Sequence, residues 1–460
     1  MLIVTHPPTY IPERDYVLSV ILGEFLGLEY RTRVADCLEV SITREGCADG
    51  RVLTMSDQLF QTPQEQWLTP LALPPRPIRV WNAVPDGLRE RLLESSVPVL
   101  YGRQLSSGAF CVFGDTHVHL GIDIFGSSFF MLTCYEELVS SVRDSYGRFP
   151  ATESLAYQVG FLHRPLINEY VEILWAALEH LWPSLRRQAR RFQLRLTHDV
   201  DEAYVVRGKS LLAVARSTLA DLVLRKDSQL AGNRLLSCYR VRRGDGDADL
   251  CNTFDFIMDL SEEQGVASAF YFMSACQSCY CLSDPWVSRL MRRIHERGHE
   301  LGFHPDLGTF RDAQLLAQEF GRLRQTSEAL GISQERWGGR HHYLQWDASV
   351  TWQAWEDAGL AYDSSVGFAD QVGFRCGTCY EFPVFNVHTR QRLQLRERPL
   401  IVMEATLLGY MGLDCEEALE QALLLKRACK RFEGEFTLLW HNARLMQRRE
   451  RELYRHVVEG

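Results

Sequence analysis

Two aspartates, Asp199 and Asp201, end the strand-like stretch FQLRLTHDVD. Side chains alternate along a strand, so both carboxylates point to one face, whereas His198 and Val200 point to the other. Two carboxylates on one face repel each other unless a cation or a proton lies between them. One of them can therefore bind a metal while the other accepts a proton from a nearby water molecule.

Four later motifs also place polar side chains where apolar stretches end. In GHELGFH the two histidines point to opposite faces of a strand, so His304 is the candidate ligand and His299 is expected to pack in the core. GRHHY contributes Arg340, YDSS contributes Asp363, and LLWHN ends an apolar strand with His441. Five such motifs in succession favour one shared site.

The elements that must position these residues alternate between strands and helices after about residue 190. A parallel sheet is expected, because strands separated by helices of 10–20 residues are typical of one. About seven such strands favour a closed, distorted (β/α) barrel with its site at the carboxyl ends of the strands. The predicted strands lie at 192–201, 266–274, 299–304, 360–368, 399–408 and 436–442. The predicted helices lie near 210–225 and at 252–265, 284–298, 311–331, 352–359 and 415–432.

The first 185 residues have a different pattern. Helical spacing of apolar residues occurs at 17–28, 125–142 and 170–182, and short strands are predicted at 97–102 and 109–115. We therefore expect an α/β accessory domain at 1–185, followed by the barrel at 190–460. An arginine-rich stretch at 186–195 lies between the two and is interpreted as solvated.

Residues 190–445 resemble the polysaccharide deacetylase family (NodB homology, carbohydrate esterases) through THDVD, GHELGFH, GRHHY and LLWHN. The stretch AYDSSVGFADQVGFRCGTCYEFPVF further resembles a subgroup with an N-terminal accessory domain that is associated with surface carbohydrates. The resemblance implies a metal-dependent hydrolase that removes N-acetyl or O-acetyl groups from a carbohydrate, which would be its partner and substrate.

The resemblance also implies residue roles. Asp199 would be the general base, oriented and kept ionised by Arg340, and His441 the general acid, oriented by Asp363. Asp201 and His304 would bind a divalent metal. Mixed nitrogen and oxygen ligands suit Zn²⁺, with Co²⁺, Ni²⁺ or Mn²⁺ as alternatives.

Two further residues are expected to contact the substrate. A backbone N–H near Tyr343 could help to stabilise an oxyanion. Arg375, within GFRCGT, is interpreted as a substrate contact, with a structural ion pair as the alternative.

One position departs from the family pattern. The family's second motif has another histidine four residues after the first, and here that position is Gly308. A third ligand must come from elsewhere, and Asp306 or extra waters are the alternatives. A four-thiolate zinc site from Cys276, Cys279, Cys376 and Cys379 is disfavoured, because the two pairs lie nearly a hundred residues apart.

Composition narrows the class of protein. Hydrophobic residues make up 46% and charged residues 24%, which is the balance of a globular protein with a full core. The net charge of −9 predicts no overall attraction to nucleic acid or anionic lipid. No stretch approaches the roughly 18 apolar residues of a membrane span. The first residues lack the pattern of a signal peptide, and the 13 scattered cysteines favour reduced thiols, so we expect a cytoplasmic protein.

Three functions remain open from the sequence. The first is deacetylation of a surface-polysaccharide precursor. The second is a catalytically inactive barrel that binds carbohydrate or acts as a scaffold for a partner, and the third is a barrel amidohydrolase acting on small cyclic amides. The oligomeric state is not predicted.

Overall fold

Residues 1–185, referred to below as the N-terminal unit, contain a six-stranded mixed sheet in the order β2-β1-β3-β4-β8-β7. The computed structural model describes residues 1–46, 50–82, 84–275 and 279–460. The strands of this unit are β1 (Leu2–His6), β2 (Tyr30–Val34), β3 (Val40–Arg44), β4 (Val52–Met55), β7 (Cys111–Phe113) and β8 (His117–Leu120), with a separate pair β5 (Arg79–Trp81) and β6 (Val97–Val99). Its helices are α1 (Ile11–Leu18), α2 (Asp86–Arg89), α3 (Ile124–Leu132), α4 (Tyr135–Val139), α5 (Leu155–Val159) and α6 (Leu166–Leu181).

The C-terminal unit, residues 190–460, contains a nine-stranded sheet in the order β14-β15-β13-β12-β11-β10-β9-β17-β16. Every neighbouring pair is parallel except the edge pair β14–β15. The strands are β9 (Gln193–Val200), β10 (Ser268–Phe272), β11 (Glu300–Phe303), β12 (Gly338–Gly339), β13 (Tyr362–Asp363), β14 (Phe382–Asn386), β15 (Gln391–Glu397), β16 (Val402–Met403) and β17 (Glu435–Leu439).

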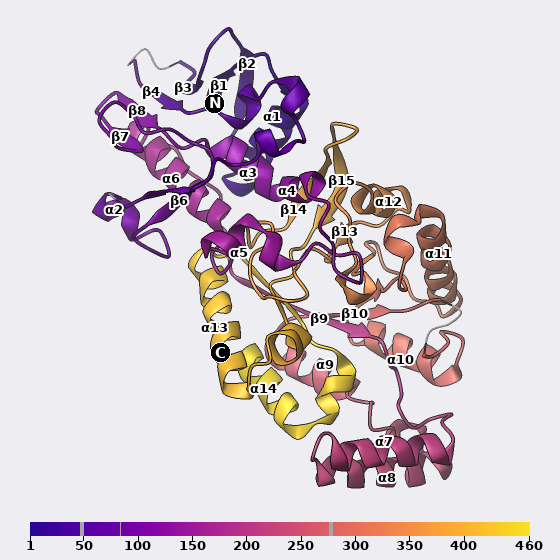
Figure 1. Ribbon diagram of the computed structural model, residues 1–460. Helices are drawn as coiled ribbons and strands as arrows, with labels where there is room; N and C mark the ends of the chain where they lie inside the picture. Colours follow the sequence, from indigo (N-terminus) through magenta and orange to yellow (C-terminus); the bar gives the residue numbers. More distant parts are fainter. Residues whose placement is uncertain (47–49, 83, 276–278) are drawn as a thin grey trace.

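Helices connect most of these strands. They are α7 (Leu211–Val223), α8 (Ser228–Arg242), α9 (Phe254–Glu263), α10 (Pro285–Glu296), α11 (Ala313–Ala329), α12 (Thr351–Asp357), α13 (Cys415–Arg431) and α14 (Arg448–Glu459). Several begin at a capping side chain; Asp284 accepts from the backbone of α10, and Asp414 with Glu417 forms a capping box on α13. Figure 1 shows the N-terminal unit at the upper left and the α7–α8 hairpin at the lower edge, away from it.

The parallel sheet was expected, but its closure into a barrel is not shown. The strand order has two ends, β16 and β14, and no pairing between described residues joins them. The β14–β15 hairpin extends one end of the sheet, and β12, β13 and β16 each contain only two residues. Strands this short offer few ladder hydrogen bonds with which to close a sheet.

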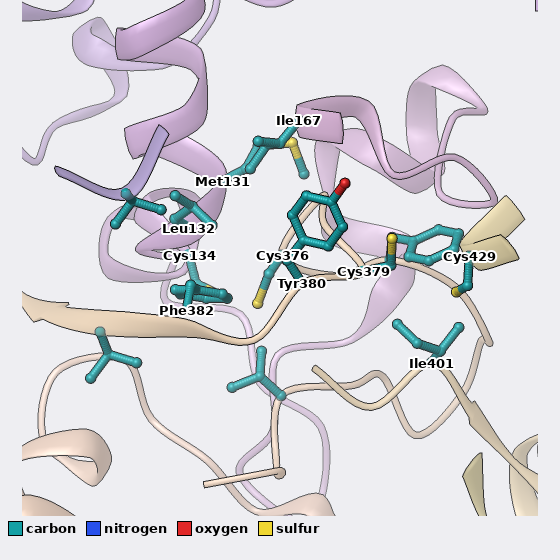
Figure 2. Close-up of a cluster of buried hydrophobic side chains, with 14 of the residues drawn as sticks. Met131, Leu132, Cys134, Ile167, Cys376, Cys379, Tyr380, Phe382, Ile401 and Cys429 are labelled. Atoms are coloured by element: carbon teal, nitrogen blue, oxygen red, sulfur yellow. The ribbon is translucent and has the colours of Figure 1, made fainter. Parts of the chain in front are cut away.

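One hydrophobic core runs through both units. Figure 2 shows Met131 and Ile167 of the N-terminal unit close to Cys376 and Tyr380 of the C-terminal unit. Gly377 lies between them in the left-handed backbone region, with φ of 66°, and a side chain there would lie 2.9 Å from the end of Met131, so glycine suits this contact. The division of the chain near residue 185 therefore stays a prediction.

The described cysteines are free thiols, and Cys376 and Cys379 are buried in this shared core. Cys279 is exposed, so it shares no site with them. Cys276, the fourth residue of the disfavoured zinc site, lies outside the described residues.

Candidate metal centre at the strand ends

Five strands deliver polar side chains to one edge of the large sheet. These strands, β16, β17, β9, β11 and β12, are parallel and lie within a run of six neighbours, so their carboxyl ends meet at one edge. A pocket of about 580 Å³ opens there. Its walls include Asp199, Asp201, His342, Glu404 and His441. Alternation along β9 explains why Asp199 and Asp201 both face the pocket. His198, which lies between Thr197 and Asp199, points to the other face and bonds to the carbonyl of Trp440.

The residues that could hold a cation are Asp201, His304 and His342. Each offers one ligand atom, and these atoms lie within 4.8 Å of one another. Asp201 Oδ1 is 3.1 Å from His304 Nε2 and Asp201 Oδ2 is 3.8 Å from His342 Nε2. Mixed imidazole and carboxylate ligands of this kind suit Zn²⁺ and neighbouring divalent metals.

The hydrogen bonds of His304 support a cation at this position. Its Nδ1 lies 2.6 Å from the carbonyl oxygen of Arg340, which can only accept, so Nδ1 carries a proton. In the neutral ring Nε2 is then a lone pair facing Asp201 Oδ1. Both atoms are buried and lack a hydrogen-bond partner among the described residues. Such atoms cost free energy unless a proton or a metal ion lies between them. Burial would lower the pKa of His304, but the Asp199 and Asp201 carboxylates outweigh it and raise that pKa, so the gap fits either a proton or a divalent cation.

The third member of the group differs from the sequence-based expectation. Asp306 lines the pocket, but it is not in the group and its Oδ1 lies 3.7 Å from His342 Nδ1. His342 takes the place proposed for Asp306. Gly308 has a left-handed backbone, with φ of 90°, and its N–H donates to Gln345, so a histidine there would be strained.

His342 was missed because two adjacent histidines follow Arg340 in a 3₁₀ turn, where strand parity does not apply. The structure separates them by burial. His341 is buried and accepts a hydrogen bond from the Trp355 indole, and burial lowers its pKa to about 3. His299 is also a packing residue, as expected, and accepts from the backbone N–H of Ser268.

Asp199 is fixed by a buried arginine. Arg340 Nη1 donates to Asp199 Oδ1 at 3.0 Å and to Thr197, and its Nε and Nη2 donate to Ser364. Arg340 is fully buried and Asp199 is only 2% exposed, so neither side chain can turn away. The other oxygen, Asp199 Oδ2, lies 3.8 Å from His304 Nδ1. This carboxylate is therefore held beside the metal group without belonging to it.

His441 is paired with Glu404 and not with Asp363. His441 Nδ1 lies 2.5 Å from Glu404 Oε1, while its Nε2 points to Asp201 Oδ2 at 3.6 Å. Asp363 instead accepts from the hydroxyl and backbone N–H of Ser365, two residues along the chain. The expectation that Asp363 orients His441 is wrong, because β13 ends on the far side of β12 from β17. Glu404 could have been suspected as the lone carboxylate in the apolar run PLIVMEATLL.

These contacts set the protonation of the pocket. Burial alone would lower the pKa of His441, but the negative charges of Glu404 and Asp201 outweigh it and raise the pKa to about 10. Burial and the neighbouring His304 lower the pKa of His342. Burial would raise the pKa of Asp201, yet the surrounding imidazoles bring it below its ordinary value. The pocket thus holds a carboxylate, a neutral imidazole and a protonated imidazole together.

The N-terminal unit contributes to the pocket wall. Arg148 lines the pocket and donates to the backbone carbonyl of Tyr343, and Asp144 anchors it through an ion pair of 2.7 Å. Tyr146 stacks on Tyr343 with ring centroids 4.9 Å apart. Tyr343 and Tyr410 leave 44% and 48% of their surfaces exposed, so aromatic surface is available at the mouth. Tyr343 lines the pocket, and its role as a substrate contact stays a prediction.

Arg375 does not reach the pocket. Its guanidinium forms two hydrogen bonds with Glu137 of the N-terminal unit, at 2.8 and 2.6 Å, and is 6% exposed. It also lies over the rings of Trp346 and Phe368. The expectation of a substrate contact is therefore wrong, and the structural ion pair is the correct alternative.

Comparisons with known proteins say little about this chain. Residues 1–183 match a family model described as a family of unknown function (DUF7033). Curated proteins gave no match. A crystal structure described as a polysaccharide deacetylase from Mycobacterium smegmatis has a TM-score of 0.39 and 14% identity, covering 59% of this chain and 84% of that one. Puue allantoinase has a TM-score of 0.34 and 12% identity, covering 70% and 91%. With TM-scores this low, neither likeness supports an inference about activity.

Among the described residues, no helix has the length and apolar character that crossing a bilayer requires.

Proposed function

We propose that the protein is a metal-dependent hydrolase that removes acetyl groups from a carbohydrate. The convergence of a candidate base, a candidate acid and three candidate metal ligands at one pocket, whose wall includes all of them except the buried His304, carries the proposal. A scaffold without activity would have no need for Arg340 to fix Asp199, or for Glu404 to fix His441, beside that group.

The chemistry follows from the positions of these side chains. A divalent cation held by Asp201, His304 and His342 would polarise the acetyl carbonyl and make water a stronger nucleophile. Asp199 accepts the proton of the attacking water, and Arg340 keeps its carboxylate in place. His441, protonated at neutral pH, donates a proton to the leaving nitrogen or oxygen. The products are acetate and a free amine, or acetate and a hydroxyl group.

A sugar substrate is supported by the walls of the pocket. Exposed tyrosine rings such as Tyr343 and Tyr410 can stack on the apolar faces of a sugar ring, and a backbone N–H near Tyr343 is our candidate for the oxyanion donor. A small cyclic amide, the substrate of the amidohydrolase alternative, would not need aromatic surface at the mouth.

The test combines metal analysis with acetate release. We expect about one divalent ion per chain, and release of acetate from N-acetyl or O-acetyl sugars after zinc or cobalt loading. His342→Gln should lower the metal content, whereas Asp306→Asn, its matched neighbour, should keep it. A protein that binds no metal and releases no acetate after loading would overturn the proposal and favour an inactive, carbohydrate-binding protein.

A further inference from the structure

The α7–α8 hairpin exposes its apolar side chains to solvent. On α7, Leu211, Leu212, Leu219, Leu222 and Val223 are between 47% and 64% exposed. At 100° per residue, these positions form one stripe along the helix. On α8, Leu235, Leu236 and Tyr239 are 54–56% exposed. A surface helix of a globular protein ordinarily turns such a stripe toward the core.

The inner face of the hairpin combines polar and apolar side chains, because Val214 of α7 and Cys238 of α8 are buried there in a small cluster. Asp221 on α7 is fully buried and accepts from Arg234 on α8 at 2.6 Å. Thr218 and Ser237 are also buried on this side. The hairpin therefore buries an ion pair and a small apolar cluster on its inner face and leaves most of its leucines outside. An apolar stripe of this length on the surface is typical of an interaction site.

The charge of the segment identifies the partner. Residues 205–243 contain nine Lys or Arg and two Asp, a net charge of +7 in a chain whose net charge is −9. Lys209, Arg216, Lys226, Arg242 and Arg243 are exposed. Apolar stripes bordered by Lys and Arg are typical of helices that lie in the interface of an anionic bilayer. A second copy of the chain would bring the same positive charge to the contact and be repelled.

We propose that the α7–α8 hairpin docks this protein on the surface of an anionic lipid bilayer. Its leucines enter the boundary between headgroups and acyl chains, and its basic side chains contact lipid phosphates. With thirteen residues, α7 is about 20 Å long, too short to cross the roughly 30 Å hydrocarbon core, so the hairpin lies in the membrane plane.

The hairpin is firmly attached to the strand that carries the pocket. The carboxylate of Asp249 accepts from the backbone N–H groups of Val205, Val206 and Arg207 at 2.8–3.0 Å. This segment directly follows the end of β9 and Asp201. Docking would therefore hold the whole C-terminal unit in a defined orientation at the bilayer.

Flotation of the full-length protein with vesicles tests the proposal. We expect binding to phosphatidylcholine vesicles that contain phosphatidylglycerol, and much weaker binding to phosphatidylcholine alone. The triple variant Leu212→Gln, Leu219→Gln, Leu222→Gln should bind at least about tenfold more weakly. Leu38→Gln with Leu71→Gln is the matched control, because these N-terminal leucines are 78% and 73% exposed, and it should bind like wild type.

Charge is tested in the same assay. Replacing Arg216, Lys226 and Arg242 by Gln should weaken binding to the anionic vesicles by about tenfold or more. Replacing Arg186 and Arg191, exposed arginines between the two units, should not. Circular dichroism would check that each variant stays folded.

Equal binding by wild type and the triple leucine variant would overturn the proposal. So would a dimer that the leucine variant dissociates, without vesicle binding by wild type.

Discussion

Asp199 is expected to be needed for turnover but not for metal binding. It contacts Arg340 and lies beside the metal group, so Asp199→Asn should lower acetate release by at least about 10²-fold while the metal stays bound. Arg340→Met should have a similar effect on turnover. Metal content and turnover of the same preparations check this, and loss of metal in Asp199→Asn would instead make Asp199 a ligand.

Glu404 is a positioning residue that acts through His441. Glu404→Gln should lower kcat about 10–100-fold with little change in KM, because the imidazole loses its charged partner but the sugar contacts remain. Asp363→Asn is the informative comparison, since Asp363 is equally buried but contacts Ser365. Steady-state kinetics of both variants show whether Glu404 or Asp363 positions His441. A larger fall of kcat in Asp363→Asn would contradict the assignment to Glu404.

Much of this pocket could be predicted from alternation along strands. Asp199, Asp201, His304 and His441 were found because each ends an apolar stretch, where side-chain direction follows from parity. His342 and Glu404 were not predicted because they lie just beyond very short strands, His342 in a 3₁₀ turn and Glu404 at the start of a helical segment, where strand alternation does not apply. Their direction is set by the tertiary packing of β12 and β16.

The contact between the two units depends on a buried ion pair between α4 and the segment before β14. Arg375→Met should destabilise the protein by about 3–5 kcal/mol, because it leaves the Glu137 carboxylate buried without its partner. Arg375→Met with Glu137→Leu should regain part of this. Urea unfolding measures the change, and Arg186→Met, at an exposed position, should stay within about 0.5 kcal/mol of wild type.

Long elements were easier to predict than short ones. The helices expected at 284–298, 311–331 and 415–432 correspond to α10, α11 and α13 within about two residues at most ends. The β14–β15 hairpin was not predicted, since β14 fell in the segment interpreted only through its resemblance to a family subgroup, and the residues of β15 were assigned to no element. The expected strand at 360–368 contains only the two paired residues of β13.

At the scale of the whole molecule, His198 should make the free energy of unfolding fall as the pH is lowered. It lies in β9, an interior strand of the large sheet, and burial lowers its pKa to about 3, against about 6.5 when unfolded. Between these values only the unfolded chain binds the proton, so the free energy of unfolding falls by up to about 1.4 kcal/mol per pH unit below pH 6.5. Urea unfolding from pH 7.5 to 5 should show a shallower fall in His198→Gln and an unchanged one in the exposed His456→Gln. Equal slopes for all three proteins would exclude this role.

The net charge of the whole chain does not reveal the local positive charge of the α7–α8 hairpin. The net charge of −9 predicted no attraction to anionic lipid, yet residues 205–243 carry +7 and expose a leucine stripe. The sequence contained this charge, but burial of Asp221 and exposure of the leucines depend on how α7 packs on α8, which composition cannot reveal.

The sheet order has a consequence for synthesis on the ribosome. β9, which carries both aspartates, pairs on one side with β17, about 240 residues later in the chain. At about 5–20 residues per second, that side of β9 waits roughly 10–50 s for its neighbour. During this time an apolar strand edge is open to other nascent chains, so the C-terminal unit should depend on chaperones until Trp440 and His441 have been added.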